Sequence, residues 1–283
     1  MTNPLTMKLE QFTRFEGSER MRLDKLLQGA SKTYPRGKTI IREGEKVEDI
    51  HLVTKGLATR SKTLADGSRQ LMAFLIPGDL CDVEVFVLEA MDHDIVALSE
   101  TTCVLIPATE MEQLLTESSN LTRAIWWSTM TDSAVLREWI VNHGRRDSRE
   151  RLAHIFCELL IRHRIVGEGL GDSVPFPLTQ EELAEASGMT PVHANRILQQ
   201  LRSEGLIELN QKVLTVLDFN GLSEAAQYDP TYLHLIRTAR GEPAVAERVG
   251  DLVPPTRGGR LHQAWEALKH PFSSDSSGGS GSG

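Results

Sequence analysis

TQEELAEASGMTPVHANRILQQLRSEGLIEL, residues 179–209, contains two helix starts separated by a glycine. Thr179 and Glu182 have the spacing of a capping box, in which the hydroxyl accepts a hydrogen bond from an early helical N–H and the carboxylate returns one to the cap. Gly188 then ends the first helix, because glycine enters the left-handed region without steric cost. Thr190 caps a second helix that begins with a proline, as the first helical position allows. The stretch therefore predicts two helices joined by a tight turn, the helix-turn-helix arrangement.

The polar face of the second helix suits the recognition of DNA. A helix-turn-helix places the N-terminal side chains of this helix against base edges in the major groove. Arg196 can pair with both acceptors of guanine and Asn195 with the edge of adenine, so we predict these two as base readers. Thr190 and His193 lie on the first turn, where the helix dipole favours a phosphate. The predicted DNA-binding residues are Thr179, Thr190, Pro191, Val192, His193, Asn195, Arg196 and Gln199.

The alternative interpretation is two amphipathic helices of an all-helical core, with a solvated polar face. The caps, the turn glycine and the polar face occur together, and this combination favours the helix-turn-helix. A hairpin is predicted directly afterwards, with strands at 206–209 and 213–216 around Asn210-Gln211-Lys212. It would form a wing beside the second helix.

The composition indicates a protein of about two domains. It has 283 residues, of which 40% are hydrophobic, and no segment approaches a membrane span or the order of a secretory signal. Three cysteines without paired spacing predict no disulfide framework, so we expect a reducing cytoplasm. The net charge of −8 is unfavourable for DNA binding, which depends on phosphate contacts. Binding is therefore expected to depend on a local basic patch of Arg145, Arg146, Arg149, Arg151, Arg162, Arg164, Arg196 and Arg202.

Upstream of these helices, regularly spaced glycines mark an all-β unit. The residues up to Gln28 have helical character, and short β-rich runs then alternate with Gly37, Gly44, Gly56, Gly67 and Gly78. Turn signals at such intervals predict a barrel or jelly roll of about 75 residues. The expected strands include 39–41, 50–53, 70–76 and 102–106, with a hairpin turn at Asp66-Gly67.

Residues 118–142 predict a long helix with more than one apolar stripe. One stripe can pack on the β-unit and the other on a second copy of the chain. We predict a homodimer, because two copies would bind a two-fold operator more tightly than one, although a helix buried wholly within one chain is the alternative. The predicted dimer contacts are Leu121, Ile125, Trp127, Thr131, Val135 and Trp139.

These elements divide the chain into segments. Asp147 and Glu150 form another capping box, which opens the first helix of the DNA-binding domain and puts the boundary near His143-Gly144. The fold class is α+β, with N-terminal helices and a β-roll over 1–117, a dimerisation helix over 118–143 and a winged helix-turn-helix over 144–235. A partly flexible extension follows over 236–272, and the Ser/Gly run 273–283 is typical of an expression tag.

This order of elements resembles the Crp/Fnr family of bacterial transcription regulators over residues 8–235. The family's second helix usually begins Ser-Arg-Glu-Thr-Val-x-Arg, and TPVHANR at 190–196 keeps Arg196. Pro191 and Val192 replace the family's Arg and Glu, so we expect an unusual operator, in which Val192 contacts a thymine methyl. The resemblance implies a dimeric activator that contacts RNA polymerase, through residues 166–175 or the β-roll. The chain has no nucleophile elbow, P-loop or zinc-protease motif, so no enzyme is predicted.

The β-roll resembles the family's cyclic-nucleotide-binding fold but lacks its phosphate motif. Cys81-Asp82-Val83-Glu84 replaces the family's Gly-Glu, and His93-Asp94-Ile95 replaces its Arg-Ser/Thr-Ala. A phosphate would meet carboxylates without an arginine, so we expect that cyclic AMP does not bind. The candidate effector pocket comprises Asp82, Glu84, Asp92, His93 and Asp94.

No cofactor is predicted. The acidic residues of this pocket have no known ligand spacing, so no metal site is predicted. Iron–sulfur regulators of this family use N-terminal cysteines, whereas the first cysteine here is Cys81, and all three cysteines have the apolar neighbours of buried thiols. Haem held by His51 or His93 stays open. The alternative to DNA binding is a sensor module whose winged domain docks onto a protein partner.

Overall fold

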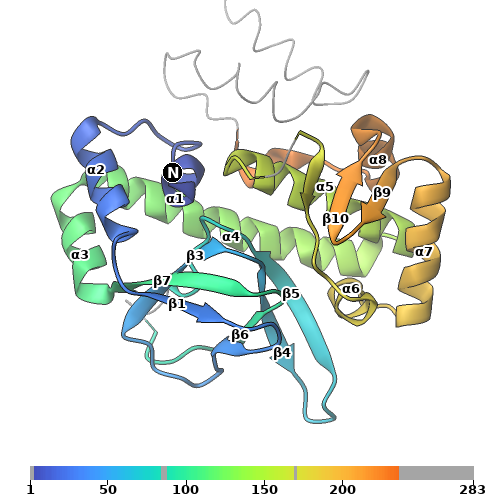
Figure 1. Ribbon diagram of the computed structural model, residues 1–283, viewed down its shortest axis with the longest axis horizontal. Coiled ribbons are helices and arrows are strands. Elements are labelled where there is room, and N and C mark those ends of the chain that lie inside the picture. Colours follow the sequence, from blue (N-terminus) through green and yellow to red (C-terminus); the bar gives the residue numbers. More distant parts are fainter. Residues whose placement is uncertain (1–2, 84–87, 169–170, 236–283) are drawn as a thin grey trace, which may run out of the picture. The chain divides into compact units, whose positions relative to one another are not determined.

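The computed structural model describes residues 3–83, 88–168 and 171–235, which belong to one compact unit (Figure 1). Glu84 and the predicted extension and tail, 236–272 and 273–283, lie outside the described residues. The chain begins with two short helices, α1 (Pro4–Leu9) and α2 (Gly17–Leu26), where helical character was predicted. None of the helices among the described residues is long and apolar enough to cross a membrane.

The predicted all-β unit is present as two antiparallel sheets. One has the strand order β1-β7-β3 and the other β2-β6-β4-β5. The strands are β1 (Ser31–Tyr34), β2 (Thr39–Ile41), β3 (Asp49–Lys55), β4 (Ala58–Thr63), β5 (Arg69–Leu75), β6 (Asp94–Ala97) and β7 (Thr101–Pro107). The expected strands lie within β2, β3, β5 and β7, with β5 ending one residue earlier than predicted.

Alternation along the strands separates two cores. On β3, Val53 points into the space between the sheets, with Leu75, Cys81 and Cys103. Leu52 points to the opposite side and packs with the N-terminal helices and with Ile125 from the long helix. The β-roll therefore buries both faces of β3 and β7, and the second face attaches it to the helices.

The glycines that marked the turns do so through their backbone conformation. Gly37, Gly44, Gly56, Gly67 and Gly78 all have positive φ, which strains other residues. Gly56 has a second constraint, because a β-carbon there would collide with the carbonyl oxygen of Glu100.

The long helix, α4 (Ser119–Arg145), follows the shorter α3 (Ala108–Glu117) and is capped by Ser118, which accepts a hydrogen bond from Leu121 N. It continues through Gly144, beyond the predicted end, and stops where Arg146 becomes extended. The next helix, α5 (Ser148–Ile165), begins with the predicted capping box of Asp147 and Glu150. Cys157 on this helix is fully buried, and burial raises the pKa of its thiol.

The C-terminal part is a winged helix-turn-helix. Its sheet has the order β8-β10-β9, so the predicted hairpin gains a third strand, β8, that was not predicted. Figure 1 shows α7 beside this sheet and α6 before it in the chain. The elements are β8 (Ser173–Pro175), α6 (Gln180–Ser187), α7 (Pro191–Ser203), β9 (Ile207–Asn210), β10 (Val213–Val216), α8 (Phe219–Ala226) and the 3-10 turn η2 (Pro230–Leu233).

Candidate nucleic-acid interface

The turn between α6 and α7 has the predicted caps. Thr179 Oγ1 accepts from Glu182 N at 3.1 Å, and a Glu182 carboxylate oxygen accepts from Thr179 N at 2.8 Å. Gly188 is left-handed, with φ 62° and ψ 37°, and Thr190 Oγ1 accepts from His193 N at 3.3 Å. The helix-turn-helix is thus specified locally, by hydrogen bonds between residues three apart.

Helix α7 buries one face and exposes the other. Ala194, Ile197, Leu198 and Leu201 are buried. Val192, Arg196 and Gln199 are exposed and share one face, Val192 having 83% of its surface free. Asn195 and His193 are half-buried at the two edges of this face. Among the remaining predicted DNA-binding residues, the structure exposes Thr179, Thr190 and Pro191.

His193 has a protein partner on each ring nitrogen. Its Nε2 lies 2.8 Å from the hydroxyl of Ser148, the first residue of α5. Its Nδ1 lies 3.0 Å from Nη2 of Arg196, one turn along α7. The ring is therefore engaged within the protein.

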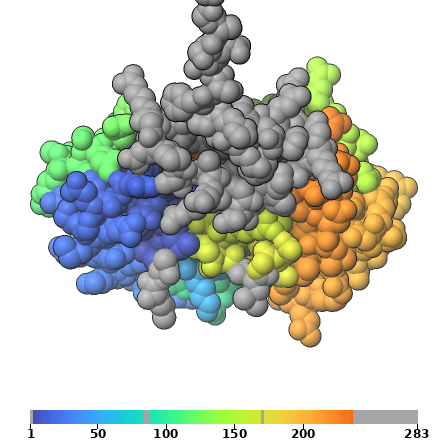
Figure 2. Space-filling view, turned by 90° about the horizontal axis from the view of Figure 1, so that it is seen from above, coloured from blue at the N-terminus to red at the C-terminus, as the bar shows by residue number. Residues whose placement is uncertain are grey.

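The wing presents a cation beside α7. Asn210 pairs with Val213, so the hairpin loop is Gln211-Lys212, and both residues have positive φ, as a type I′ turn requires. Lys212 is exposed at the tip. In Figure 2 the gold surface to which α7 contributes lies beside the orange surface of the wing and the elements that follow it.

The expected basic patch is wrong in extent, because most of its arginines have partners within the protein. Arg149 bridges to Glu204 at 2.5 Å and lowers the pKa of that carboxyl. Arg151 donates to the backbone carbonyls of Asn142 and Ser187, and Arg162 pairs with Asp79 and Glu158. Arg146 and Arg164 pair with acids as well. The exposed members of the set are Arg145, Arg196 and Arg202.

The predicted dimer contacts on α4 also need correction. Leu121, Ile125, Thr131, Val135 and Trp139 are each at most 7% exposed, and Trp127 is half-buried against Phe12, with ring centroids 5.7 Å apart. These residues form the stripe that packs inside the chain, so they cannot also meet a partner. A helix with two apolar stripes does not reveal from its sequence which one faces inward.

The exposed apolar side chains of α4 lie on its other face. They include Trp126, Met130 and Ile140, which are 68%, 53% and 72% exposed. With Ser133 and Arg137 they follow alternating steps of four and three residues, the spacing of a coiled-coil seam. Leu136 and Val141 are exposed beside the seam.

The structure brings only two residues of the candidate effector pocket together in one cavity. A cavity of about 390 Å³ lies between the β-roll and α4, and Asp92 and His93 line it. Asp82 is fully buried instead, and its two carboxylate oxygens accept hydrogen bonds from the backbone N and the ring Nδ1 of His51, each at 2.8 Å. Asp94 accepts from Glu43 N at 2.9 Å, outside the cavity lining.

The cavity lining also includes two cationic side chains that were not predicted from the sequence. Arg60 and Lys62 line it from β4, opposite Thr129, Asp132 and Ser133 on α4. Arg60 is 7% exposed, and its Nη2 donates to the carbonyl of Leu80 at 3.2 Å. The expectation of a purely acidic site was therefore wrong, although this guanidinium is already engaged within the protein.

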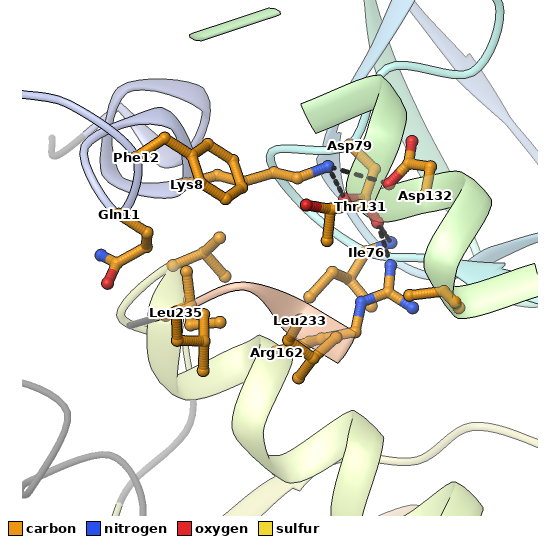
Figure 3. A pocket seen from close by; sticks show the side chains of 13 residues that line it. Lys8, Gln11, Phe12, Ile76, Asp79, Thr131, Asp132, Arg162, Leu233 and Leu235 are labelled. Carbon is orange, nitrogen blue, oxygen red and sulfur yellow. Dashed lines mark hydrogen bonds and ion pairs between the residues drawn. The ribbon is translucent and has the colours of Figure 1, made fainter. Parts of the chain in front are cut away.

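An ionic cluster around the buried Asp79 joins the β-roll to the winged domain (Figure 3). Asp79, in the turn after β5, accepts from Lys8 of α1 at 2.8 Å and from Arg162 of α5 at 2.7 Å. Oδ1 of Asp132, on α4, lies 3.5 Å from Nζ of Lys8. Burial opposes ionisation of Asp79, but the two cations outweigh it and lower its pKa to about 2. The cluster borders a cavity of about 30 Å³.

The β-roll also holds α6 directly. Arg69 of β5 bridges to Glu185 at 2.6 Å, and Gln70 donates to the backbone carbonyl of Glu185 at 2.8 Å. Arg36 pairs with Glu182 in the capping box. The domain that carries the cavity is thus in contact with the first helix of the helix-turn-helix.

A β-roll joined by a long helix to a winged helix-turn-helix defines a class of DNA-binding transcription regulators. Two family models match the chain in this order, a cyclic nucleotide-binding domain at residues 31–118 and a Crp-like helix-turn-helix domain at residues 150–225. The chain belongs to the Crp/Fnr family, which confirms the resemblance and the α+β fold class. It is a DNA-binding transcription regulator.

Individual relatives agree with this assignment. The transcriptional activator protein FnrL of Cereibacter sphaeroides is 28% identical over 204 residues, 70% of this chain and 81% of that protein. The nitrogen fixation regulation protein FixK of Bradyrhizobium diazoefficiens is 25% identical over 183 residues, 64% of this chain and 76% of that protein. The solved structure of FixK2 from Bradyrhizobium japonicum has the same fold, with a TM-score of 0.63 and 21% identity over 71% of this chain and 98% of that one. These relatives are transcription regulators rather than enzymes.

Proposed function

We propose that the protein is a homodimer that reads a palindromic operator through α7 and activates transcription by contacting RNA polymerase in the cytoplasm, without catalysing a reaction. The observation that carries the first part is the exposed face of α7, on which Val192 and Arg196 stand free of the core. The similar protein FnrL is a transcriptional activator, which supports activation rather than repression.

Within the operator half-site, Arg196 reads guanine and Val192 contacts a thymine methyl. Asn195 contacts a base from the edge of the same face. Lys212 on the wing and the threonines at the starts of α6 and α7, Thr179 and Thr190, contact phosphates and position the helix. Few arginines are exposed near α7, so we expect a moderate dependence of affinity on salt.

The dimer forms through the exposed seam of α4. Trp126, Met130 and Ile140 would be buried against the same residues of the second copy, as in an isologous interface. Two winged domains would then present their α7 helices to half-sites about one helical turn apart.

Selection of bound DNA from a random library tests the proposal. The purified protein, without added ligand, should enrich a palindrome. Enrichment of a single half-site would contradict the dimer. Absence of enrichment would favour either an effector requirement or the alternative that the winged domain docks onto a protein. Transcription in vitro from the selected operator, with RNA polymerase, then tests activation.

The effector, if the regulator has one, occupies the cavity between β4 and α4, where Asp92 and His93 meet Arg60 and Lys62. We expect that cyclic AMP does not bind in this cavity. Asp92 and Asp132 lie beside the cations and would repel its phosphate, and Arg60 already donates to a carbonyl. Titration calorimetry with cyclic AMP and cyclic GMP should show no binding, and a micromolar dissociation constant for either would overturn this expectation.

A further inference from the structure

A hydrogen-bonded chain connects the start of α5 to the arginine on the exposed face of α7. Ser148 Oγ, His193 Nε2, His193 Nδ1 and Arg196 Nη2 follow one another, with separations of 2.8 Å and 3.0 Å across the two hydrogen bonds. The two ends of this chain are 48 residues apart in the sequence, and the imidazole is the group that links them.

The chemistry of arginine fixes the tautomer of His193. A guanidinium has five N–H donors and no acceptor, so Arg196 must donate and His193 Nδ1 must accept. In a neutral imidazole the proton then lies on Nε2, which donates to the hydroxyl of Ser148. The ring is thereby held in one orientation from both sides.

This arrangement restricts the conformation of the Arg196 side chain but leaves most of its N–H donors available. One of its five N–H groups is used by the imidazole, and at least one two-pronged edge of the guanidinium is left for a base. A long side chain that is already oriented loses less conformational freedom when it binds. In contrast, His193 has no ring N–H left for a phosphate unless the bond to Ser148 breaks.

We propose that His193 is a positioning residue that orients Arg196 for one base pair of the operator, with Ser148 as its anchor, and that it is not a phosphate contact. The inference rests on the proposed base-reading role of Arg196. It assigns specificity to a side chain that does not itself touch the base.

The test compares His193→Leu with His193→Asn on the full-length protein. Asparagine places its Oδ1 where the imidazole has Nδ1, so it keeps an acceptor for Arg196, whereas leucine has none. The measurements are the affinity for the selected operator, the affinity for operators changed at single base pairs, and the slope of affinity against salt. Thermal unfolding verifies that each variant is folded.

His193→Leu should lose at least about threefold discrimination at one base pair, a change typical of residues in contact. The salt slope should stay unchanged, and His193→Asn should restore most of the discrimination. Ser148→Ala should weaken discrimination at the same base pair to a smaller degree. Glu204→Ala, which breaks the other bridge between α5 and α7 at Arg149, is the control and should leave discrimination unchanged.

Two outcomes overturn the inference. One is full discrimination in His193→Leu. The other is an equal loss of affinity for all sequences with a salt slope smaller by about one, which marks a phosphate contact. Arg196→Ala separates this failure from failure of the proposed function. If Arg196→Ala keeps full discrimination, its base-reading role is wrong. If it loses discrimination, adding His193→Leu should cause no further loss, and an additional loss would show that His193 acts independently.

Discussion

Helices α4 and α7 are both amphipathic, but they expose opposite kinds of surface. Helix α7 buries its aliphatic residues and exposes Arg196 and Gln199, whereas α4 is apolar on two faces and exposes Trp126 and Ile140. An exposed polar face beside a wing with Lys212 at its tip suits DNA, and an exposed apolar seam suits a second protein surface. The chemistry of the exposed face of each helix indicates the kind of partner that it binds. The sequence identifies that face in α7, which has one apolar stripe, but not in α4, which has two.

The largest expected effect comes from the inner face of α4. Trp139 is 3% exposed, stacks edge-on against Phe74 with centroids 5.4 Å apart, and donates to Glu158 at 3.2 Å. Trp139→Ala should lower the free energy of unfolding by about 3–5 kcal/mol, because it leaves a cavity and removes the donor. Denaturant titration at fixed protein concentration measures the loss. A change below 1 kcal/mol would mean that this face is not the one held inside the chain.

Ile140, the next residue, provides the matched substitution on the outer face. It is 72% exposed, so Ile140→Glu should leave the fold intact and weaken the dimer by about 2–4 kcal/mol, as for an apolar hot-spot residue that is replaced by a charge. Analytical ultracentrifugation over a range of concentrations measures the dissociation constant. An unchanged dimer would show that the seam is not the interface.

Low pH should also destabilise the packing on the inner face of α4, where Asp132 belongs to the ionic cluster around Asp79. The pKa of Asp79 is lowered from 3.8 to about 2, so its stabilising effect is fully present above pH 3.8 and is lost as the pH falls toward 2. This shift corresponds to roughly 2 kcal/mol. Asp79→Asn should remove this part of the acid dependence, which unfolding measured between pH 5 and 2 would detect. An identical pH profile in the variant would contradict the cluster's role.

Arg196→Ala tests the exposed face of α7. It should reduce discrimination at one base pair by about 1–3 kcal/mol, because a bidentate pair with guanine is lost. Arg202→Ala, on the same helix and also exposed, is the control and should weaken binding to all sequences equally. If both variants behaved alike, Arg196 would be a phosphate contact and the face would carry affinity without specificity.

The sequence predicted the elements that short-range chemistry specifies. The caps of α6 and α7 connect residues three apart. All the glycines that predict turns have positive φ. Strand β1 was missed because it is a polar edge strand with three exposed residues, and β4 because Arg60 and Ser61 are buried in it despite their polarity. Periodicity detects neither case.

The candidate site was harder to predict where its residues are distant in the chain. Glu204 pairs with Arg149 and so removes an arginine from the predicted patch, and Arg60 reaches the cavity from a strand that was not predicted. Ser148 meets His193 across 45 residues. Such pairs depend on tertiary packing, so no local spacing announces them.

The smallest expected effect concerns the wing that completes the surface of α7. Gln211 and Lys212 have φ of 48° and 64°, a conformation that glycine adopts more easily than either. Lys212→Gly should therefore stabilise the fold by up to about 1 kcal/mol while removing the cation at the tip of the wing. Gln211→Gly gives the same relief without a change of charge, so it separates the two effects.

Both wing variants should raise the melting temperature, but only Lys212→Gly should reduce the salt slope of DNA binding, by about one. If the salt slopes of the two variants were equal, Lys212 would not contact a phosphate. The DNA-binding surface would then be limited to α7 and would not include the wing. A reduced slope in Lys212→Gly alone would extend that surface to the wing. A net acidic chain could then bind DNA through a small number of exposed cations, because affinity depends on the charges that meet the phosphates and not on the sum over the chain.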